Sequence, residues 1–148
     1  MITADTNLFV YLWDNSEPGK RQVAQVATAY IAGRGGPIGL QVIGELQNSL
    51  RRKMRQSASE AAQHAHDILT TFDIFAASET NAEESLALMA VGRLSYWDAL
   101  LITAARDAGC RVMLSEDMHD GARFGDLEIL NPFGPAGPSD RLKVLLSA

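Results

Sequence analysis

Four acidic residues are the side chains of this 148-residue chain that could act together in catalysis. Asp5 directly follows the strand-like residues that open the chain, and Asp117 follows a later apolar run in the same way. Glu45 and Asp98 lie in expected helices, each beside the apolar face of its helix. A carboxylate at the carboxyl end of a strand lies where open α/β sheets bind ligands. We therefore hypothesise that acids from two strand ends and two helices share one site.

A cluster of carboxylates has a specific chemical requirement. Two carboxylates about 4 Å apart repel each other by some 4 kcal/mol at an effective dielectric constant near 20. They therefore require a divalent cation or a shared proton. Oxygen ligands with open water positions suit Mg²⁺ or Mn²⁺, and one or two such ions can lower the pKa of a bound water and shield a phosphodiester. The acids thus predict hydrolytic phosphoryl chemistry.

Each acid also has an ordinary structural interpretation. Asp5 and Asp98 stand where acids cap a helix or favour its dipole, and Glu45 could be a solvated helix residue. Near Asp117, the neighbouring acids Glu116 and Asp120 are equally able to be the fourth member of the site. The sequence alone leaves that choice open.

The elements that must position these acids alternate between strand and helix. The expected strands are residues 1–4, 38–40, 70–76, 111–114 and 127–130. The expected helices are residues 8–13, 20–32, 41–55, 57–69, 81–94 and 95–108, the fifth of them capped by Thr80 or Asn81. This alternation implies a parallel sheet covered by helices on both faces. The acids can converge only if the first and fourth strands are neighbours.

The chain is expected to form one α/β domain over residues 1–133. Residues 134–148 open with Gly-Pro-Ala-Gly-Pro and are expected to be a loose surface segment of the same domain, with one terminal helical turn. A hydrophobic content of 47% and a charged content of 21% are typical of a soluble globular protein. No apolar run approaches the roughly 18 residues that span a membrane, and no signal peptide is visible. The single cysteine, Cys110, favours a reducing cytoplasm.

The net charge of −5 argues against a protein that coats nucleic acid by bulk electrostatics. It does not argue against a nuclease whose acids surround a bound cation. The one basic run is Arg51, Arg52, Lys53 and Arg55 at the end of the Glu45 helix. These cations either complement the helix C-terminus or contact RNA phosphates.

Four short segments, taken in their order along the chain, carry a family resemblance. They are Asp5-Thr6-Asn7, Gln41-Val42-Ile43-Gly44-Glu45, Ser95-Tyr96-Trp97-Asp98-Ala99-Leu100 and Ser115-Glu116-Asp117. In order and spacing they resemble the motifs of the PIN-domain ribonucleases, and in particular of the VapC-type toxins of bacterial toxin–antitoxin systems. The resemblance covers nearly the whole chain up to Phe133. It implies a Rossmann-like three-layer α/β/α sandwich with a central parallel sheet.

The same resemblance implies a Mg²⁺- or Mn²⁺-dependent endoribonuclease, usually a homodimer held inactive by a cognate antitoxin protein. It gives catalytic and metal-binding roles to four acids: Asp5 as the central ligand, with Glu45, Asp98 and Asp117 as ligands or water positioners. It gives supporting roles to Thr6, Asn7, Ser115 and Glu116. Two positions depart from the family pattern, because Gly39 stands where relatives often have serine and Ser115 leads a triplet usually led by threonine.

Other functions fit parts of the pattern. A PIN-fold nuclease that processes RNA would carry the same acids without a toxin role, and a non-catalytic α/β module would bind RNA or protein with the same fold. A Mg²⁺ phosphatase with an aspartyl nucleophile would want a second acid where this chain has Asn7. It would also want a catalytic lysine late in the chain, where only Lys143 in the tail is available.

Overall fold

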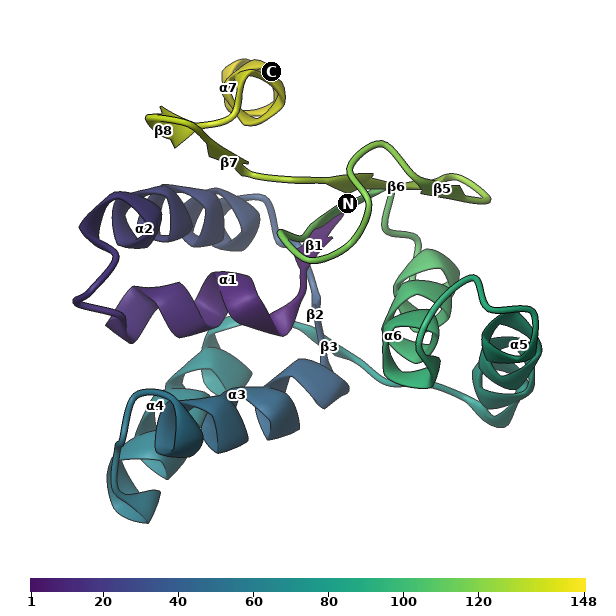
Figure 1. The fold of residues 1–148 in the computed structure, drawn as a ribbon, viewed down its shortest axis with the longest axis horizontal. Coiled ribbons are helices and arrows are strands. Elements are labelled where there is room, and N and C mark those ends of the chain that lie inside the picture. The colour runs from purple at the N-terminus through teal and green to yellow at the C-terminus, as the bar shows by residue number, and fades with distance from the viewer.

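A four-stranded sheet with the strand order β1–β4–β6–β5 lies at the centre of the computed structural model, which describes all 148 residues (Figure 1). Strands β1 (Ile2–Ala4), β4 (Val112–Leu114) and β6 (Leu127–Leu130) are parallel. The edge strand β5 (Arg123–Phe124) is antiparallel to β6 and was not expected from the sequence. The direct pairing of β1 with β4 is the adjacency that convergence of the acids requires.

Strands β2 (Ile38–Gly39) and β3 (Ile74–Phe75) form a separate two-stranded parallel ladder. The expected strand at residues 70–76 is therefore much shorter than predicted. Helix α4 (Ala58–Thr71) runs into it and leaves only two residues for pairing. The β-branched and aromatic residues of this stretch favoured a strand, but the helix continues through the threonines, whose hydroxyls bond to carbonyls of the preceding turn.

Helices flank the central strands on both sides (Figure 1). On one side are α1 (Thr6–Val10) with the 3₁₀ turn η1 (Tyr11–Trp13), α2 (Pro18–Gly33), α3 (Leu40–Arg52) and α4. On the other side are α5 (Glu79–Ala90) and α6 (Tyr96–Asp107). The α/β architecture with a central, mostly parallel sheet flanked by helices is the predicted one.

Regular apolar spacing explains why the helices pack as they do. In α3, Val42, Leu46 and Leu50 recur every four residues and all three are fully buried. They face the same core as Phe9 of α1 and Met113 of β4. Helix α3 thereby holds its polar residues, Glu45 among them, at a fixed distance from the end of the sheet.

Helix α5 begins earlier than expected. Its N-cap is Ser78 and not Thr80 or Asn81: the Asn81 amide donates to the Ser78 hydroxyl at 3.2 Å. The Asn81 side chain accepts from the Ser78 amide at 2.9 Å, which completes a capping box. The helix ends at Ala90 because Gly92 adopts a left-handed conformation, with φ of 73°.

The C-terminal segment is more ordered than predicted. It forms a hairpin of β7 (Phe133–Gly134) and β8 (Gly137–Pro138), followed by helix α7 (Asp140–Ser147). Helix α7 has about two turns, where one was expected. Leu142 is fully buried, and the Tyr30 hydroxyl of α2 donates to the Leu145 carbonyl at 2.9 Å. The Gly-Pro composition predicted looseness, but one buried leucine and contacts with α2 fix the segment beside that helix (Figure 1).

No helix of this fold combines the length and the apolar character needed to cross a membrane. Cys110 is buried and forms no disulfide, and burial raises the pKa of its thiol to about 11. It serves as a small core residue.

Candidate active site

The carboxyl ends of β1 and β4 bring Asp5 and Ser115 side by side. The ladder continues one residue past each strand, since the Asp5 amide donates to the Leu114 carbonyl at 3.0 Å and the Ser115 amide donates to the Leu130 carbonyl at 3.0 Å. The Ser115 hydroxyl accepts from the Met118 amide at 3.2 Å and donates to Asp5 Oδ2 at 2.5 Å. Backbone pairing thus sets the position of the Asp5 main chain, and the Ser115 hydroxyl orients its carboxylate.

Asp5 is buried, with 7% of its surface exposed, and its second oxygen, Oδ1, has no hydrogen-bond partner. It occupies the N-cap position of α1, but its side chain makes no capping hydrogen bond, so capping alone does not account for it. Burial raises the pKa of Asp5 to about 7 against the opposing Ser115 hydrogen bond, and the charges of Asp117 and Asp98 raise it further. A buried carboxylate oxygen without a partner is costly, and a cation would satisfy it.

Glu45 is held by two neutral donors. The Thr6 hydroxyl donates to Glu45 Oε2 at 2.8 Å, and Gln41 Nε2 donates to Glu45 Oε1 at 2.5 Å. Gln41 also donates to the Trp97 carbonyl at 3.0 Å, which ties the first turn of α3 to the first turn of α6. Gln41 was not among the residues predicted to support the acids. The signal that could have found it is its position four residues before Glu45 on one helix.

Asp98 lies in the first turn of α6 and is half-buried. Ser95 caps the helix by accepting from the Asp98 amide at 3.1 Å, but the reciprocal bond of a capping box, from the Ser95 amide to the Asp98 carboxylate, is absent. Burial raises the pKa of Asp98, and the charges of Glu45 and Asp117 add to the effect. Its carboxylate therefore lies within electrostatic reach of the other acids.

The acids of the β4–β5 loop have different partners. Asp117 accepts a hydrogen bond from the side-chain amide of Asn7 and raises the pKa of Asp5 through its charge. Glu116 instead accepts from the Tyr11 hydroxyl at 2.6 Å and forms an ion pair with Lys20. Of these two neighbours, only Asp117 is coupled to the acids at the strand ends.

Asp120, the third acid of that loop, also lies outside the cluster. It accepts from the Asn131 amide at 2.9 Å and forms an ion pair with Arg141 at 2.6 Å. By contrast, none of the four clustered acids forms an ion pair with any lysine or arginine of the chain. The cluster is therefore the one group of coupled carboxylates that the protein leaves without a counter-charge.

The donor set fits a hard divalent cation. It consists of carboxylate oxygens, and Asp5 Oδ1 is buried without a partner at its centre. No three acids lie close enough together to form a ready-made metal site. A hard divalent ion here would be held by one or two of the carboxylates and would keep several of its own waters.

The basic run ends beside the cluster. Arg51 and Arg52 lie in the last turn of α3, and Lys53 follows as the C-cap. Lys53 lines a cavity together with Asn7 and Asp117, whereas the three arginines of the run do not line it.

Gly39, at the N-cap of α3, has a structural reason to differ from the serine of relatives. A β-carbon at this position would lie 2.7 Å from Leu101 Cδ1 and 3.2 Å from the ring of Phe75. The chain packs Leu101 into the space that a serine would need. The N-terminus of α3 consequently has no side-chain cap.

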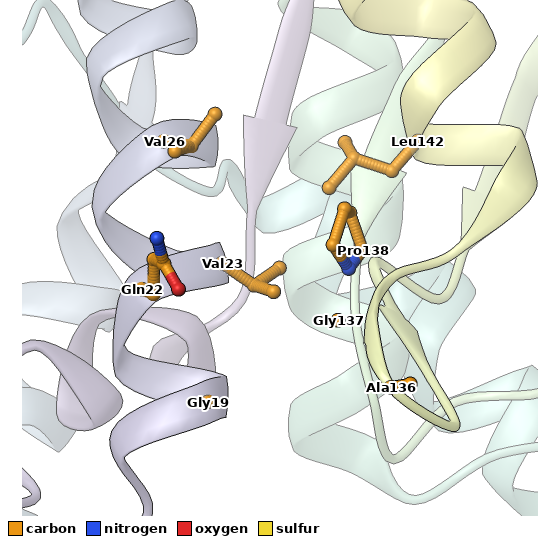
Figure 2. Close-up of a pocket in the computed structure, with 8 residues that line it drawn as sticks. All are labelled: Gly19, Gln22, Val23, Val26, Ala136, Gly137, Pro138 and Leu142. Atoms are coloured by element: carbon orange, nitrogen blue, oxygen red, sulfur yellow. The ribbon is translucent and has the colours of Figure 1, made fainter.

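An apolar cavity of about 300 Å³ between α2 and the C-terminal hairpin is a second candidate for a site (Figure 2). Its lining residues are Gly19, Gln22, Val23, Val26, Ala136, Gly137, Pro138 and Leu142. None of these side chains can titrate, bind a metal or act as a nucleophile. This cavity therefore offers none of the side chains that catalysis would need, in contrast to the carboxyl ends of β1 and β4.

Comparison with known proteins identifies the family and the fold of this chain. The PIN domain family matches residues 2–119 of this chain. No curated protein sequence is significantly similar to it. A toxin–antitoxin complex from Klebsiella pneumoniae contains a chain that is 20% identical, with a TM-score of 0.65 over 90% of this chain and 98% of that chain.

Two further solved structures are similar. VapC20 of Mycobacterium tuberculosis, a toxin that cleaves the sarcin–ricin loop, is 16% identical, with a TM-score of 0.58 over 79% of this chain and 90% of that chain. VapBC2 of Rickettsia felis, bound to a DNA fragment from its promoter, is 18% identical, with a TM-score of 0.64 over 87% of this chain and 97% of that chain. At these identities the likeness shows a shared fold. With the family match covering most of the chain, this protein belongs to the PIN domain family.

Proposed function

We propose that this PIN domain is a Mg²⁺- or Mn²⁺-dependent endoribonuclease that hydrolyses RNA phosphodiester bonds. One observation carries the proposal: four coupled carboxylates meet at the end of the sheet with no lysine or arginine paired to them. They are Asp5, Glu45, Asp98 and Asp117. Coupled carboxylates without a counter-charge repel one another and bind a cation that enters from solution.

The residues of the chain divide the work between orientation and charge. The Ser115 hydroxyl orients Asp5, the side-chain amide of Asn7 orients Asp117, and Thr6 with Gln41 orients Glu45. These donors are neutral, so they fix the directions of the carboxylates without cancelling their charge. Glu116 supports the loop through Tyr11 and Lys20 and is not a ligand in this proposal.

In this arrangement Asp5 is the central metal ligand. Glu45, Asp98 and Asp117 are further ligands or hold the attacking water. Bound Mg²⁺ or Mn²⁺ would lower the pKa of a water and shield the charge that develops on the phosphodiester. The partly exposed carboxylates at the rim can accept the proton that the attacking water releases.

The test is a digest of RNA by the purified chain with Mg²⁺ or Mn²⁺, with a chelator as the metal-free arm. Asp5→Asn should reduce cleavage by at least about 100-fold while the circular dichroism spectrum stays that of the folded protein. Asp120→Asn is the matched control, because the same substitution there removes an ion-paired acid, and it should cut RNA at the wild-type rate. Equal cleavage by wild type and Asp5→Asn would exclude the mechanism. A folded wild type that binds RNA but never cuts it would indicate a non-catalytic binding module.

Within this function we propose the role of toxin in a toxin–antitoxin pair, with a cognate antitoxin as partner, a homodimer as the assembly and the cytoplasm as the location. Support comes from the similar chains in the Klebsiella pneumoniae and Rickettsia felis complexes. Residues 1–133 are assigned to the PIN domain and residues 134–148 to a tail packed on it. Expression in a bacterial host should arrest growth, Asp5→Asn should not, and a small protein encoded beside the gene should restore growth. Cleavage without growth arrest would favour an RNA-processing nuclease.

A further inference from the structure

A polar cavity of about 250 Å³ opens directly beside the acid cluster. Its lining residues are Asn7, Val10, Tyr11, Asp14, Lys53, Met54, Glu116 and Asp117. Asp117 belongs to the cluster and Asn7 donates a hydrogen bond to it, so the cavity and the proposed catalytic site are continuous. At about 30 Å³ for each water of liquid volume, the space equals about eight waters. That is room for a sugar–phosphate unit of a nucleic-acid strand.

Lys53 is the cation of this cavity that has no partner. Its ammonium forms no ion pair and no hydrogen bond, although Asp14, Glu116 and Asp117 line the same cavity. Glu116 is already neutralised by Lys20. A lysine ammonium is a compact, strongly hydrated charge that binds phosphate well. Lys53 therefore offers an unused phosphate-binding group at the edge of an otherwise acidic cavity.

The main chain holds Lys53 in place. The Lys53 amide donates to the Ser49 carbonyl at 2.8 Å, and the Gln56 amide donates to the Leu50 carbonyl at 3.1 Å. Between them Arg55 adopts a left-handed conformation with φ of 54°, which is uncommon for a residue other than glycine. The neighbouring Met54 is partly buried against the core. The turn that carries Lys53 is therefore a fixed wall of the cavity.

We propose that this cavity is the subsite for the nucleotide next to the scissile bond, and that Lys53 binds its backbone phosphate. The proposal rests on the nuclease function and adds which part of the RNA the protein holds. It separates Lys53 from the rest of the basic run, because Arg51, Arg52 and Arg55 do not line the cavity.

The experiment measures RNA binding in the Asp5→Asn background, where cleavage does not interfere. The probe is a fluorescein-labelled single-stranded RNA of twelve nucleotides with mixed sequence, and the readout is its anisotropy across a KCl series in the presence of Mg²⁺. Lys53→Gln should weaken binding about 3- to 10-fold at low salt. It should also reduce the slope of log K against log salt by about 0.7, the value for one phosphate contact of a single strand.

Two matched variants complete the design. Lys53→Arg keeps the charge and should keep the slope, while Arg52→Gln removes one charge from the neighbouring residue and should leave the slope unchanged. A methylphosphonate at the phosphate that Lys53 binds should weaken binding to the parent protein and not to Lys53→Gln. Equal effects of Lys53→Gln and Arg52→Gln would overturn the proposal, as would no effect of Lys53→Gln.

The result is separable from the test of the nuclease function. Lys53-dependent binding by a wild type that cuts no RNA would sustain phosphate binding by Lys53 in this cavity and reject the nuclease function. RNA cleavage by wild type with binding independent of Lys53 would reject the subsite and sustain the nuclease.

Discussion

Two groups of acidic residues in this fold meet opposite electrostatic conditions. Between β6 and α7, Arg141 forms ion pairs with Asp120 at 2.6 Å and with Glu128, and Arg123 pairs with Glu128 at 2.6 Å. Each carboxylate there has an arginine. At the carboxyl ends of β1 and β4, the acids are coupled to one another and have only hydroxyl and amide donors.

The difference separates a structural cluster from the proposed functional one. Arginines from the chain satisfy the first group and attach α7 to the sheet, so no capacity to bind a cation remains there. The second group keeps its charge, and burial raises the pKa of Asp5 to about 7 because the protein supplies no cation. Sites that bind a ligand commonly retain such unfavourable interactions, which the ligand relieves. Mutual coupling together with the absence of a counter-charge distinguishes the proposed site from the paired acids.

Neutralising one acid of each group should give the largest difference in RNA cleavage. Asp98→Asn should lower kcat/KM for RNA cleavage by about 100-fold or more, because it removes a charge that the proposed metal site needs. Glu128→Gln makes the same isosteric change in the paired group and should leave kcat/KM within about 2-fold. Steady-state cleavage of a labelled RNA measures both. Comparable losses in the two variants would show that the pairing of an acid does not predict its role.

The pH dependence of stability should differ between wild type and Asp5→Asn in metal-free buffer. Asp5 has a folded pKa of about 7 against an ordinary value of 3.8, so between these values the folded state holds a proton that the unfolded state has lost. The free energy of unfolding should therefore fall as pH rises from about 4 to about 7, by up to about 1.4 kcal/mol per pH unit. Above pH 7 the contribution of Asp5 should no longer change with pH. Asp5→Asn should lack that component.

Urea denaturation at a series of pH values measures the difference. Mg²⁺ or Mn²⁺ should restore stability to wild type at pH 7 and above, where the Asp5 carboxylate is ionised, and should do less for Asp5→Asn. Parallel pH profiles for the two proteins would contradict the assignment of a buried, uncompensated charge to Asp5.

Removing one hydroxyl from each region should separate an effect on RNA cleavage from an effect on stability. Ser115→Ala deletes the hydrogen bond that orients Asp5 and should reduce kcat/KM about 10-fold, as is typical for groups that orient metal ligands. Ser139→Ala deletes the hydroxyl that caps α7 and should cost about 1 kcal/mol of stability without loss of kcat/KM. Cleavage rates and denaturation midpoints of both variants are the measurements. A catalytic defect in Ser139→Ala would mean that the C-terminal helix acts on the site.

The smallest expected effect is that of Arg141→Gln. The Arg141 side chain is 40% exposed, so its ion pairs with Asp120 and Glu128 should contribute about 1 kcal/mol or less. Hydrogen exchange should accelerate in α7, while RNA cleavage should be unchanged. The control is Arg93→Gln, since Arg93 forms no ion pair, and it should leave the exchange of α7 as in wild type.

The sequence allowed the main elements to be predicted and the candidate acids to be named, with the fourth acid left open, because both depend on local pattern. Apolar spacing identifies α3 and α6, and an acid after an apolar run identifies Asp5 and Asp117. It missed Gln41, whose contact with the Trp97 carbonyl joins two helices far apart in the chain. It also underestimated α7, because Gly-Pro composition says nothing about the burial of Leu142.

The order of residues alone placed one acid after the first strand and further acids after the strand that ends at Leu114, and therefore at one edge of a parallel sheet. Only the tertiary structure decided which acids remain without a counter-charge. Lys20 reaches Glu116 and Arg141 reaches Asp120 across long stretches of chain, whereas no cation reaches Asp5 or Asp98. The physical reason is that charge pairing acts over a few ångströms in space, and those distances exist only once the fold brings remote segments together.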